Sequence, residues 1–342
     1  MQIIVHPKVL PLANPFRIAH ESRTEQPTLI VELVDATGRS GFGEAAMTRY
    51  YSLDSAECAS ALQNLAPALA LRKSLSPAAL HDFLDREAPT LHPFLRCALD
   101  VAAHDLEGKH QNKRIGELWD QPARRTPTCY TIGMGSIPEM VAKVKAFPWP
   151  LYKIKLGGDG DDLDIIRALR NVTDAPFYVD ANTGWTAQQT IDYAPELQAM
   201  GVLLIEQPLL VADEAGQARV KAASPLPIIA DESCQTEADV AKCAELFDGI
   251  NIKIVKCGGL LPARRMIQMA RERKLQVMAG CMTESSFGIS AIAQLLPELD
   301  YADMDGAMLL AKDPGEGVTF DPRTGLAIYP DRPGTGARWR NE

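Results

Sequence analysis

Several common sequence signatures are missing from this chain of 342 residues. It has no uncharged apolar run of about 18 residues, so we expect no membrane span. Its first residues, MQIIVHPKVL, lack the basic segment and the long apolar run of a secretory signal. The seven cysteines are scattered without a CxxC pair, which argues against a disulfide framework or a zinc ribbon. Reduced thiols in a cytoplasmic protein are the simplest interpretation.

A basic surface is missing as well. The chain carries 35 Lys and Arg against 44 Asp and Glu, a net charge of −9, so we expect no nucleic-acid partner. Its six histidines form no HxH or HExxH pattern, which weakens a zinc-hydrolase interpretation. The pairs Gly157-Gly158 and Gly258-Gly259 lack the GxxxxGKS or GxxxxGKT context of a phosphate-binding loop, so we interpret them as tight turns.

The length suggests a large domain and a smaller one. The smaller one comes first, because apolar β patterns at 2–12, 28–35 and 40–44 are followed by helical patterns at 54–70, 77–86 and 93–108. Turn signals at Gln121-Pro122 and Thr126-Pro127 suit a boundary. We therefore predict an α+β domain over 1–122, completed by the tail 311–342.

Short apolar strands alternate with helical patterns from about residue 128 onward. Eight strands with seven long connections are expected, at 129–132, 151–156, 177–180, 202–206, 228–231, 250–255, 276–279 and 301–303. Repeated βα units imply a parallel sheet, and eight strands suggest closure into a barrel. We predict an α/β fold in which 123–310 form a modified (β/α)7β TIM barrel; an open doubly wound sheet is the alternative.

Four consecutive strands of this predicted barrel end in a charged residue. Lys155, Asp180, Glu206 and Asp231 lie 25 or 26 residues apart, the length of one βα unit. The carboxyl ends of barrel strands converge on one mouth, where active sites are found. These four side chains are therefore expected to meet there.

Strand alternation indicates which lysines share that mouth, because successive side chains point to opposite faces. The second strand then directs Lys153 and Lys155 inward. In the sixth strand, INIKIVK, Lys253 faces inward if Ile252 and Ile254 cover the helix side. Lys256 is then expected to be a solvated lysine on the loop beyond the strand.

Three neighbouring carboxylates would repel one another unless a cation lies between them. Oxygen-only ligands favour Mg²⁺, so Asp180, Glu206 and Asp231 are predicted to bind it. An amine on each side, Lys155 and Lys253, suits proton transfer to and from a substrate carbon, with the metal stabilising the enolate. The cation and Lys153 should lower the pKa of Lys155 from about 10.4 toward about 7–8.

Taken in order, the motifs KIK, DAN, EQP, ADES and NIK, which begin at residues 153, 180, 206, 230 and 251, resemble the enolase superfamily in its muconate-lactonizing subgroup. The resemblance covers nearly the whole chain. It implies that the N-terminal α+β unit is a capping domain and that each subunit binds one Mg²⁺. A homo-oligomer is expected.

Within the subgroup the chain looks most like the dipeptide epimerases. The segment GCMTES, with Cys281 and Met282, matches their seventh strand, and Asp303-Met304-Asp305 matches the Asp-x-Asp that holds a dipeptide's α-ammonium group. Thr131 is carried over as a substrate contact. The resemblance implies an isomerase that epimerises the C-terminal residue of a dipeptide: one lysine removes the α-proton and the other returns it on the opposite face.

The capping loops are expected to set side-chain specificity. The first reads NPFRIAHESRT and contains Arg17 and Arg23; relatives acting on L-Ala-Glu dipeptides use an arginine in this loop, a place that aligns with Glu21 here. The second is expected at 49–51, with Tyr51 as a substrate contact.

Two other functions are compatible with parts of this pattern. A lyase or cycloisomerase, such as an o-succinylbenzoate synthase or a muconate cycloisomerase, would use the same metal and lysines without needing Asp303 and Asp305. A non-catalytic metal-dependent binding protein on this scaffold belongs to a different class.

Overall fold

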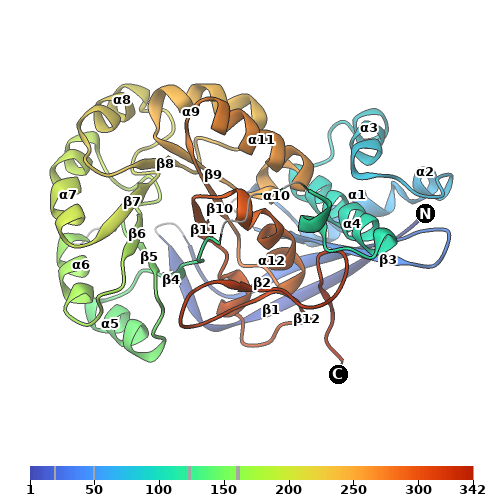
Figure 1. Cartoon of the computed structure of the whole chain (residues 1–342), viewed down its shortest axis with the longest axis horizontal. Coiled ribbons are helices and arrows are strands. Elements are labelled where there is room, and N and C mark those ends of the chain that lie inside the picture. Colours follow the sequence, from blue (N-terminus) through green and yellow to red (C-terminus); the bar gives the residue numbers. More distant parts are fainter. Residues whose placement is uncertain (19–20, 49–50, 120, 122–124, 159–161, 342) are drawn as a thin grey trace.

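The computed structural model describes residues 1–18, 21–48, 51–119, 121, 125–158 and 162–341. Two parts lie side by side in Figure 1: a ring of strands surrounded by helices, and a flat sheet with its own helices. Among the described residues, no helix is both long enough and apolar enough to cross a membrane.

The N-terminal sheet has three antiparallel strands in the order β1 (Gln2–Ile18), β2 (Glu21–Val34) and β3 (Ser40–Ala46). The prediction of a loop over residues 14–24 is wrong for the described part of it. After an irregularity between Pro11 and Phe16, pairing resumes and runs through Arg17↔Ser22 to Ile18↔Glu21. The long hairpin therefore carries this segment as strand toward the barrel.

Four helices follow on this sheet: α1 (Ser55–Gln63), α2 (Ala66–Ala70), α3 (Pro77–Glu87) and α4 (Pro93–Gln111). One helix was predicted over 54–70, but it is broken in two because Pro67, in the first turn of α2, has no N–H for a continuous helix. Gly41 and Gly43 let α4 pack directly on β3. A Cβ at either would lie about 2 Å from a carbonyl oxygen of α4.

The barrel has eight parallel strands whose order in space follows the sequence: β4 (Tyr130–Ile132), β5 (Tyr152–Lys155), β6 (Phe177–Asp180), β7 (Val202–Glu206), β8 (Ile228–Ala230), β9 (Gly249–Ile252), β10 (Gln276–Gly280) and β11 (Tyr301–Asp303). A parallel bridge between Thr128 and Ala302 joins the first strand to the last. The sheet therefore closes, and the open-sheet alternative is wrong.

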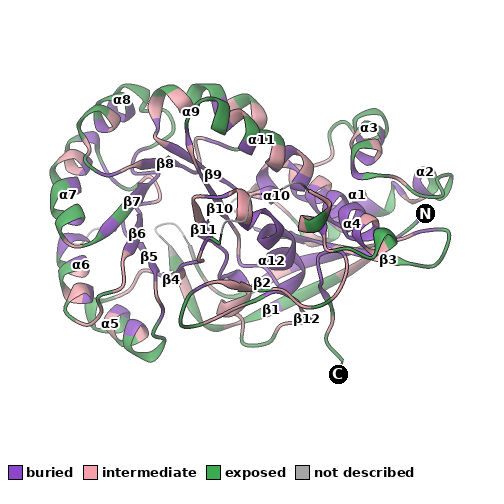
Figure 2. Cartoon of the chain, viewed as in Figure 1, coloured by how far each residue is buried: buried purple, intermediate pink, exposed green. Residues whose placement is uncertain are grey.

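Helices surround this ring, and Figure 2 shows buried strands inside and exposed outer helix faces. They are α5 (Ile137–Ala146), α6 (Asp162–Arg170), α7 (Ala187–Ala199), α8 (Glu214–Ala223), α9 (Val240–Leu246), α10 (Ile254–Cys257), α11 (Leu260–Glu272) and α12 (Ser286–Ile292). The sixth strand was predicted to reach Val255, but it ends at Ile252 because the chain winds into α10.

The C-terminal tail runs back from the barrel to the N-terminal part. Its strands are β12 (Gly315–Glu316), β13 (Thr319–Phe320), β14 (Ala327–Ile328) and β15 (Arg338–Trp339). Leu12 bridges Leu310, and the Thr335 amide donates a hydrogen bond to the buried Asp105 of α4. The tail thus contacts both β1 and α4.

The barrel interior changes from apolar to charged along its axis. A buried apolar cluster formed by inward-facing residues of six strands fills the bottom: Cys129, Leu151, Tyr178, Leu204, Ile229 and Met278. Two residues further along β5, β6 and β7, the inward positions are Lys153, Asp180 and Glu206. The apolar layer therefore supports a charged layer at the barrel mouth.

Candidate active site

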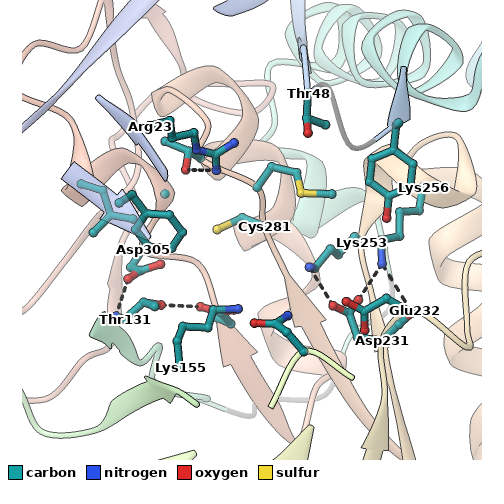
Figure 3. A pocket seen from close by; sticks show the side chains of 18 of the residues that line it. Arg23, Thr48, Thr131, Lys155, Asp231, Glu232, Lys253, Lys256, Cys281 and Asp305 are labelled. Atoms are coloured by element: carbon teal, nitrogen blue, oxygen red, sulfur yellow. Dashed lines mark hydrogen bonds and ion pairs between the residues drawn. The ribbon is translucent and has the colours of Figure 1, made fainter. Parts of the chain in front are cut away.

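A pocket opens at the carboxyl ends of the barrel strands, with the N-terminal domain forming its other wall (Figure 3). It encloses about 900 Å³ including its open mouth. The barrel supplies the charged lining residues, among them Lys155, Asp231 and Lys253, while Phe16, Arg23 and Tyr51 come from the N-terminal domain.

Lys153 is the central cation beneath this pocket. Its Nζ lies 3.0 Å from Asp180 Oδ2, 2.6 Å from Glu206 Oε2 and 2.8 Å from Asp303 Oδ2, and its side chain is fully buried. Burial alone would lower the pKa of Lys153, but the three carboxylates outweigh it and raise that pKa well above its ordinary value. Lys153 is therefore a fixed cation that holds three strands together.

Lys155 and Lys253 reach the pocket from opposite walls, because β5 and β9 are the second and sixth of the eight strands in the ring. Lys155 Nζ lies 2.5 Å from Asp180 Oδ2, and Lys253 Nζ lies 3.0 Å from Asp231 Oδ2. Their side chains are 10% and 11% exposed, against 0% for Lys153. The predicted inward direction of Lys153, Lys155 and Lys253 is confirmed.

Lys256 is not the solvated loop lysine that the strand pattern indicates. It lies in α10, only 4% exposed, with its Nζ 2.7 Å from Asp231 Oδ1. The helical turn after β9 brings Lys256 back to the side that Lys253 faces. Both lysines therefore pair with Asp231, one on each carboxylate oxygen.

Burial and the neighbouring lysines give the carboxyl groups at the barrel mouth different pKa values. Burial raises the pKa of a carboxyl group, yet Lys155 and Lys153 bring that of Asp180 down to about 2. Burial and the neighbouring Asp180 raise the pKa of Glu206 to about 7. For Asp231, Lys253 and Lys256 overcome burial and lower the pKa.

Asp303 and Asp305 form a second acidic group where β11 meets β4. Asp305 Oδ2 accepts a hydrogen bond from the Thr131 amide at 2.6 Å, and the Thr131 hydroxyl donates to Asp303 at 3.5 Å. Burial and the charge of Asp303 raise the pKa of Asp305 to about 7. A cation beside this pair would relieve that repulsion.

Family comparisons agree with this geometry. Residues 1–119 match the N-terminal domain of mandelate racemase/muconate lactonizing enzyme, and residues 139–342 match the enolase C-terminal domain-like family. The chain belongs to the enolase superfamily. Its barrel and its antiparallel sheet are the barrel and the capping domain of that superfamily, so the fold prediction is confirmed.

Individual relatives are similar over nearly their whole length. The L-Ala-D/L-amino acid epimerases of Maribacter sp. (strain HTCC2170) and Flavobacterium johnsoniae are 47% and 45% identical; each alignment covers 98% of this chain, and 98% and 99% of the relative. A dipeptide epimerase from Methylococcus capsulatus, solved with Mg and the dipeptide L-Arg-D-Lys, has a TM-score of 0.89 and 30% identity, with 99% of both chains covered.

The superfamily's acidic residues at the barrel mouth have oxygen atoms available for a metal. Among the residues described, no three carboxylate, histidine or cysteine side chains enclose an ion as they stand, and lysine ammonium groups lie between the carboxylates. However, Asn182 Oδ1 and Glu232 Oε2 are buried and accept no hydrogen bond, and Glu206 Oε2 is paired with the Lys153 ammonium alone. An all-oxygen set of this kind fits Mg²⁺.

The sequence reasoning missed three polar residues of this site. Asn251 donates to Glu206 Oε1 at 2.8 Å, while Asn182 and Glu232 line the pocket. The pKa of Glu232 is raised to about 7 by burial and by Asp231. Asn182 and Glu232 stand within the DAN and ADES motifs, and Asn251 is two residues before Lys253, so strand alternation could have found it.

The remaining predicted substrate contacts divide into two groups. Thr131, Cys281 and Met282 line the pocket, as do Arg23 and Tyr51. Arg23 donates to Thr283 Oγ1 at 2.9 Å and lies over the Phe16 ring. Arg17 is exposed and outside the pocket lining, near Glu139 and Lys143. Arg49 and Tyr50 of the second capping loop lie outside the described residues.

Proposed function

We propose that the chain is a Mg²⁺-dependent dipeptide epimerase. The observation that carries this proposal is the order of functional groups around the barrel. Lys155 and Lys253 stand on opposite strands; the three carboxylates occupy one arc between them, and Asp303 and Asp305 occupy the other. A substrate that spans the mouth would meet a metal at one end and an acidic pair at the other.

The metal would be held by Asp180, Glu206 and Asp231, on the consecutive strands β6 and β7 and at the end of β8. Bound there, Mg²⁺ supplies positive charge that neutralises these carboxylates, lowers the pKa of neighbouring lysines and stabilises negative charge on the substrate carboxylate. An all-oxygen site is supported by Asn182 Oδ1 and Glu232 Oε2, which are buried beside these carboxylates and accept no hydrogen bond.

The two lysines would exchange one proton with the substrate. A dipeptide whose C-terminal carboxylate lies at the metal, and whose α-ammonium group lies at Asp303 and Asp305, places the α-carbon of its C-terminal residue between Lys155 and Lys253. One Nζ removes the α-proton from one face and becomes an ammonium; the other ammonium delivers a proton to the opposite face. The configuration inverts, and no other bond changes.

Asp303 and Asp305 would bind the dipeptide's α-ammonium group. The repulsion that raises the pKa of Asp305 is relieved when a substrate cation lies between the two carboxylates. A lyase or cycloisomerase acting on a substrate without an amine would gain nothing from this pair.

The central test is α-proton exchange in D₂O. A library of dipeptides, incubated with protein and MgCl₂, should acquire one deuterium at the C-terminal residue's α-carbon, read by mass spectrometry, and should be epimerised, read by chiral chromatography. Removing metal with EDTA should abolish both and MgCl₂ should restore them. Absence of exchange across the whole library, with metal present, would contradict the proposal.

Two further proposals concern the state of the protein. We propose a cytoplasmic location, which the seven unbonded cysteines support. We also propose a homo-oligomer, which light scattering of the purified chain would test; a mass near 37.3 kDa would contradict it.

A further inference from the structure

Lys256 uses all of its hydrogen-bond donors on protein atoms. Its Nζ donates to Asp231 Oδ1 at 2.7 Å and to the Asp231 carbonyl oxygen at 3.4 Å. It also hydrogen-bonds with the Tyr51 side chain. A lysine ammonium has three N–H groups, and these three acceptors account for them. Lys256 therefore has no donor left over for a substrate.

The two hydrogen bonds from Lys256 restrain the orientation of the Asp231 side chain. Lys256 contacts the carboxylate and the main chain of the same residue, which fixes the orientation of the Asp231 side chain relative to β8. The other carboxylate oxygen, Oδ2, faces Lys253 at 3.0 Å. Lys256, whose side chain is only 2% exposed, thus holds one oxygen of Asp231 and leaves the other toward the pocket.

Tyr51 connects this arrangement to the capping domain. Its ring lies 5.1 Å from the ring of Phe94, in the first turn of α4, and its side chain lines the pocket. The α10 turn that carries Lys256 itself packs against α4. A continuous path of contacts therefore runs from Phe94 through Tyr51 and Lys256 to Asp231.

We propose that Lys256 is a positioning residue that orients Asp231 for the metal and couples it, through Tyr51, to the docked capping domain. This inference rests on the proposed function, because it takes Asp231 as a metal ligand. Lys256 transfers no proton. Its contribution is to make the geometry of a barrel carboxylate depend on a residue of the capping domain.

The direction in which Mg²⁺ affinity changes when Lys256 is replaced shows whether Lys256 positions Asp231 or acts only as a nearby positive charge. If Lys256 acted only as a nearby positive charge, its removal would tighten Mg²⁺ binding by reducing repulsion. If it positions Asp231, its removal weakens binding, and the loss of such supporting contacts typically costs about 10–100-fold in metal affinity. Isothermal calorimetry, with MgCl₂ titrated into Lys256→Met in the absence of substrate, should therefore show Mg²⁺ binding at least about tenfold weaker than that of the parent.

Lys242→Met is the matched control, because Lys242 is an exposed lysine that also pairs with a carboxylate, Glu214, at 2.5 Å. Its Mg²⁺ affinity should equal that of the parent. Equal or tighter binding by Lys256→Met would overturn the positioning role. A parent protein that binds no Mg²⁺ would instead overturn the proposed function, so the two failures are distinguishable.

Tyr51→Phe tests the coupling without touching either bond to Asp231. It should weaken Mg²⁺ binding several-fold, in the same direction as Lys256→Met, because Lys256 loses its capping-side contact and restrains Asp231 less. In a Lys256→Met background the same change should have no further effect on Mg²⁺ affinity. Independent, multiplying effects on Mg²⁺ affinity, or an unchanged affinity in Tyr51→Phe, would overturn the coupling. If Lys256→Met does not fold, Lys256→Gln replaces it in both tests, with the same expected results.

Discussion

The carboxylate of Glu44, on strand β3 of the capping domain, accepts hydrogen bonds from both the amide and the hydroxyl of Ser285 at the start of α12. It also accepts from the Gly288 amide at 3.0 Å and from Thr28 Oγ1 at 2.9 Å. Glu44 therefore caps a barrel helix from another domain. The loop just before that helix contributes Cys281, Met282 and Thr283 to the pocket.

Replacing Glu44 by Ala should destabilise the whole protein and loosen the pocket wall. Three buried donors, the amide and hydroxyl of Ser285 and the Gly288 amide, would lose their acceptor, whereas the Thr28 hydroxyl keeps the Ala45 carbonyl. An unsatisfied buried group costs about 1–3 kcal/mol. We expect a loss of at least about 3 kcal/mol in chemical denaturation. Glu32→Ala on β2, where the glutamate bonds the partly buried His6 and Ser40, is the control and should cost less. Equal losses would contradict a special role for Glu44.

Glu284 should make stability fall as the pH rises. Burial, and then the charge of Glu44, raise the pKa of Glu284 from 4.5 to about 8. The folded state thus favours the protonated form, so this contribution is fully present below about pH 4.5 and is lost as the pH passes about 8. Glu284→Gln cannot ionise. Relative to the parent, its melting temperature should rise between pH 5 and pH 9, and a constant difference across that range would contradict the assignment.

Much of the site could be predicted because strand alternation and unit spacing are local properties of the sequence. The inward direction of Lys153, Lys155 and Lys253 follows from which neighbours are apolar, and the spacing of Asp180 and Asp231 follows from the length of a βα unit. These patterns hold in the structure because an ionic side chain on the apolar helix side of a strand would be strongly disfavoured.

The contacts between domains could not be predicted in the same way. Glu44 is 241 residues from Ser285 in the sequence, and nothing around it indicates its partner. Lys256 was misplaced because INIKIVK alternates like a strand to its end, whereas the chain turns into a helix after Lys253. The tight turn ends at Gly258, whose φ of 97° favours glycine.

Arg23 should determine how acidic dipeptides bind. Its guanidinium group lies in the pocket wall beside Thr283 and Phe16. Arg23→Met should raise the KM for dipeptides with an acidic C-terminal side chain by about tenfold or more, since a charge-assisted bond is worth about 1.5–3 kcal/mol. Dipeptides with an apolar C-terminal residue should be little affected. Arg17→Met, outside the pocket, is the control; equal effects in the two variants would contradict this role.

Asp305→Asn should weaken substrate binding through the α-ammonium group. The amide retains the shape of the carboxylate and can still accept from the Thr131 amide, which lies 2.6 Å away, but it carries no charge. We expect the dipeptide KM to rise by at least about tenfold, the effect of losing one charge-assisted hydrogen bond. N-acetylated dipeptides, which have no ammonium, should be poor substrates of the parent and no worse for the variant. Asp174→Asn, at an exposed aspartate, is the control.

Single replacements of the two pocket lysines should separate proton exchange from epimerisation. Lys155 and Lys253 reach the pocket from opposite strands, so each faces one side of the substrate's α-carbon. Lys155→Met leaves Lys253 able to remove and return a proton on its own face of the α-carbon, and Lys253→Met leaves Lys155 able to do so on the other face.

In D₂O each variant should therefore exchange the α-proton of one epimer only, and the two variants should select opposite epimers. Epimerisation should fall by about 10²–10⁴-fold in both, the usual contribution of a general acid or base. Lys242→Met should behave like the parent. Two outcomes would contradict this assignment: a variant that exchanges both epimers, or two variants that each exchange neither epimer. Either would show that Lys155 and Lys253 do not act on opposite faces of the α-carbon.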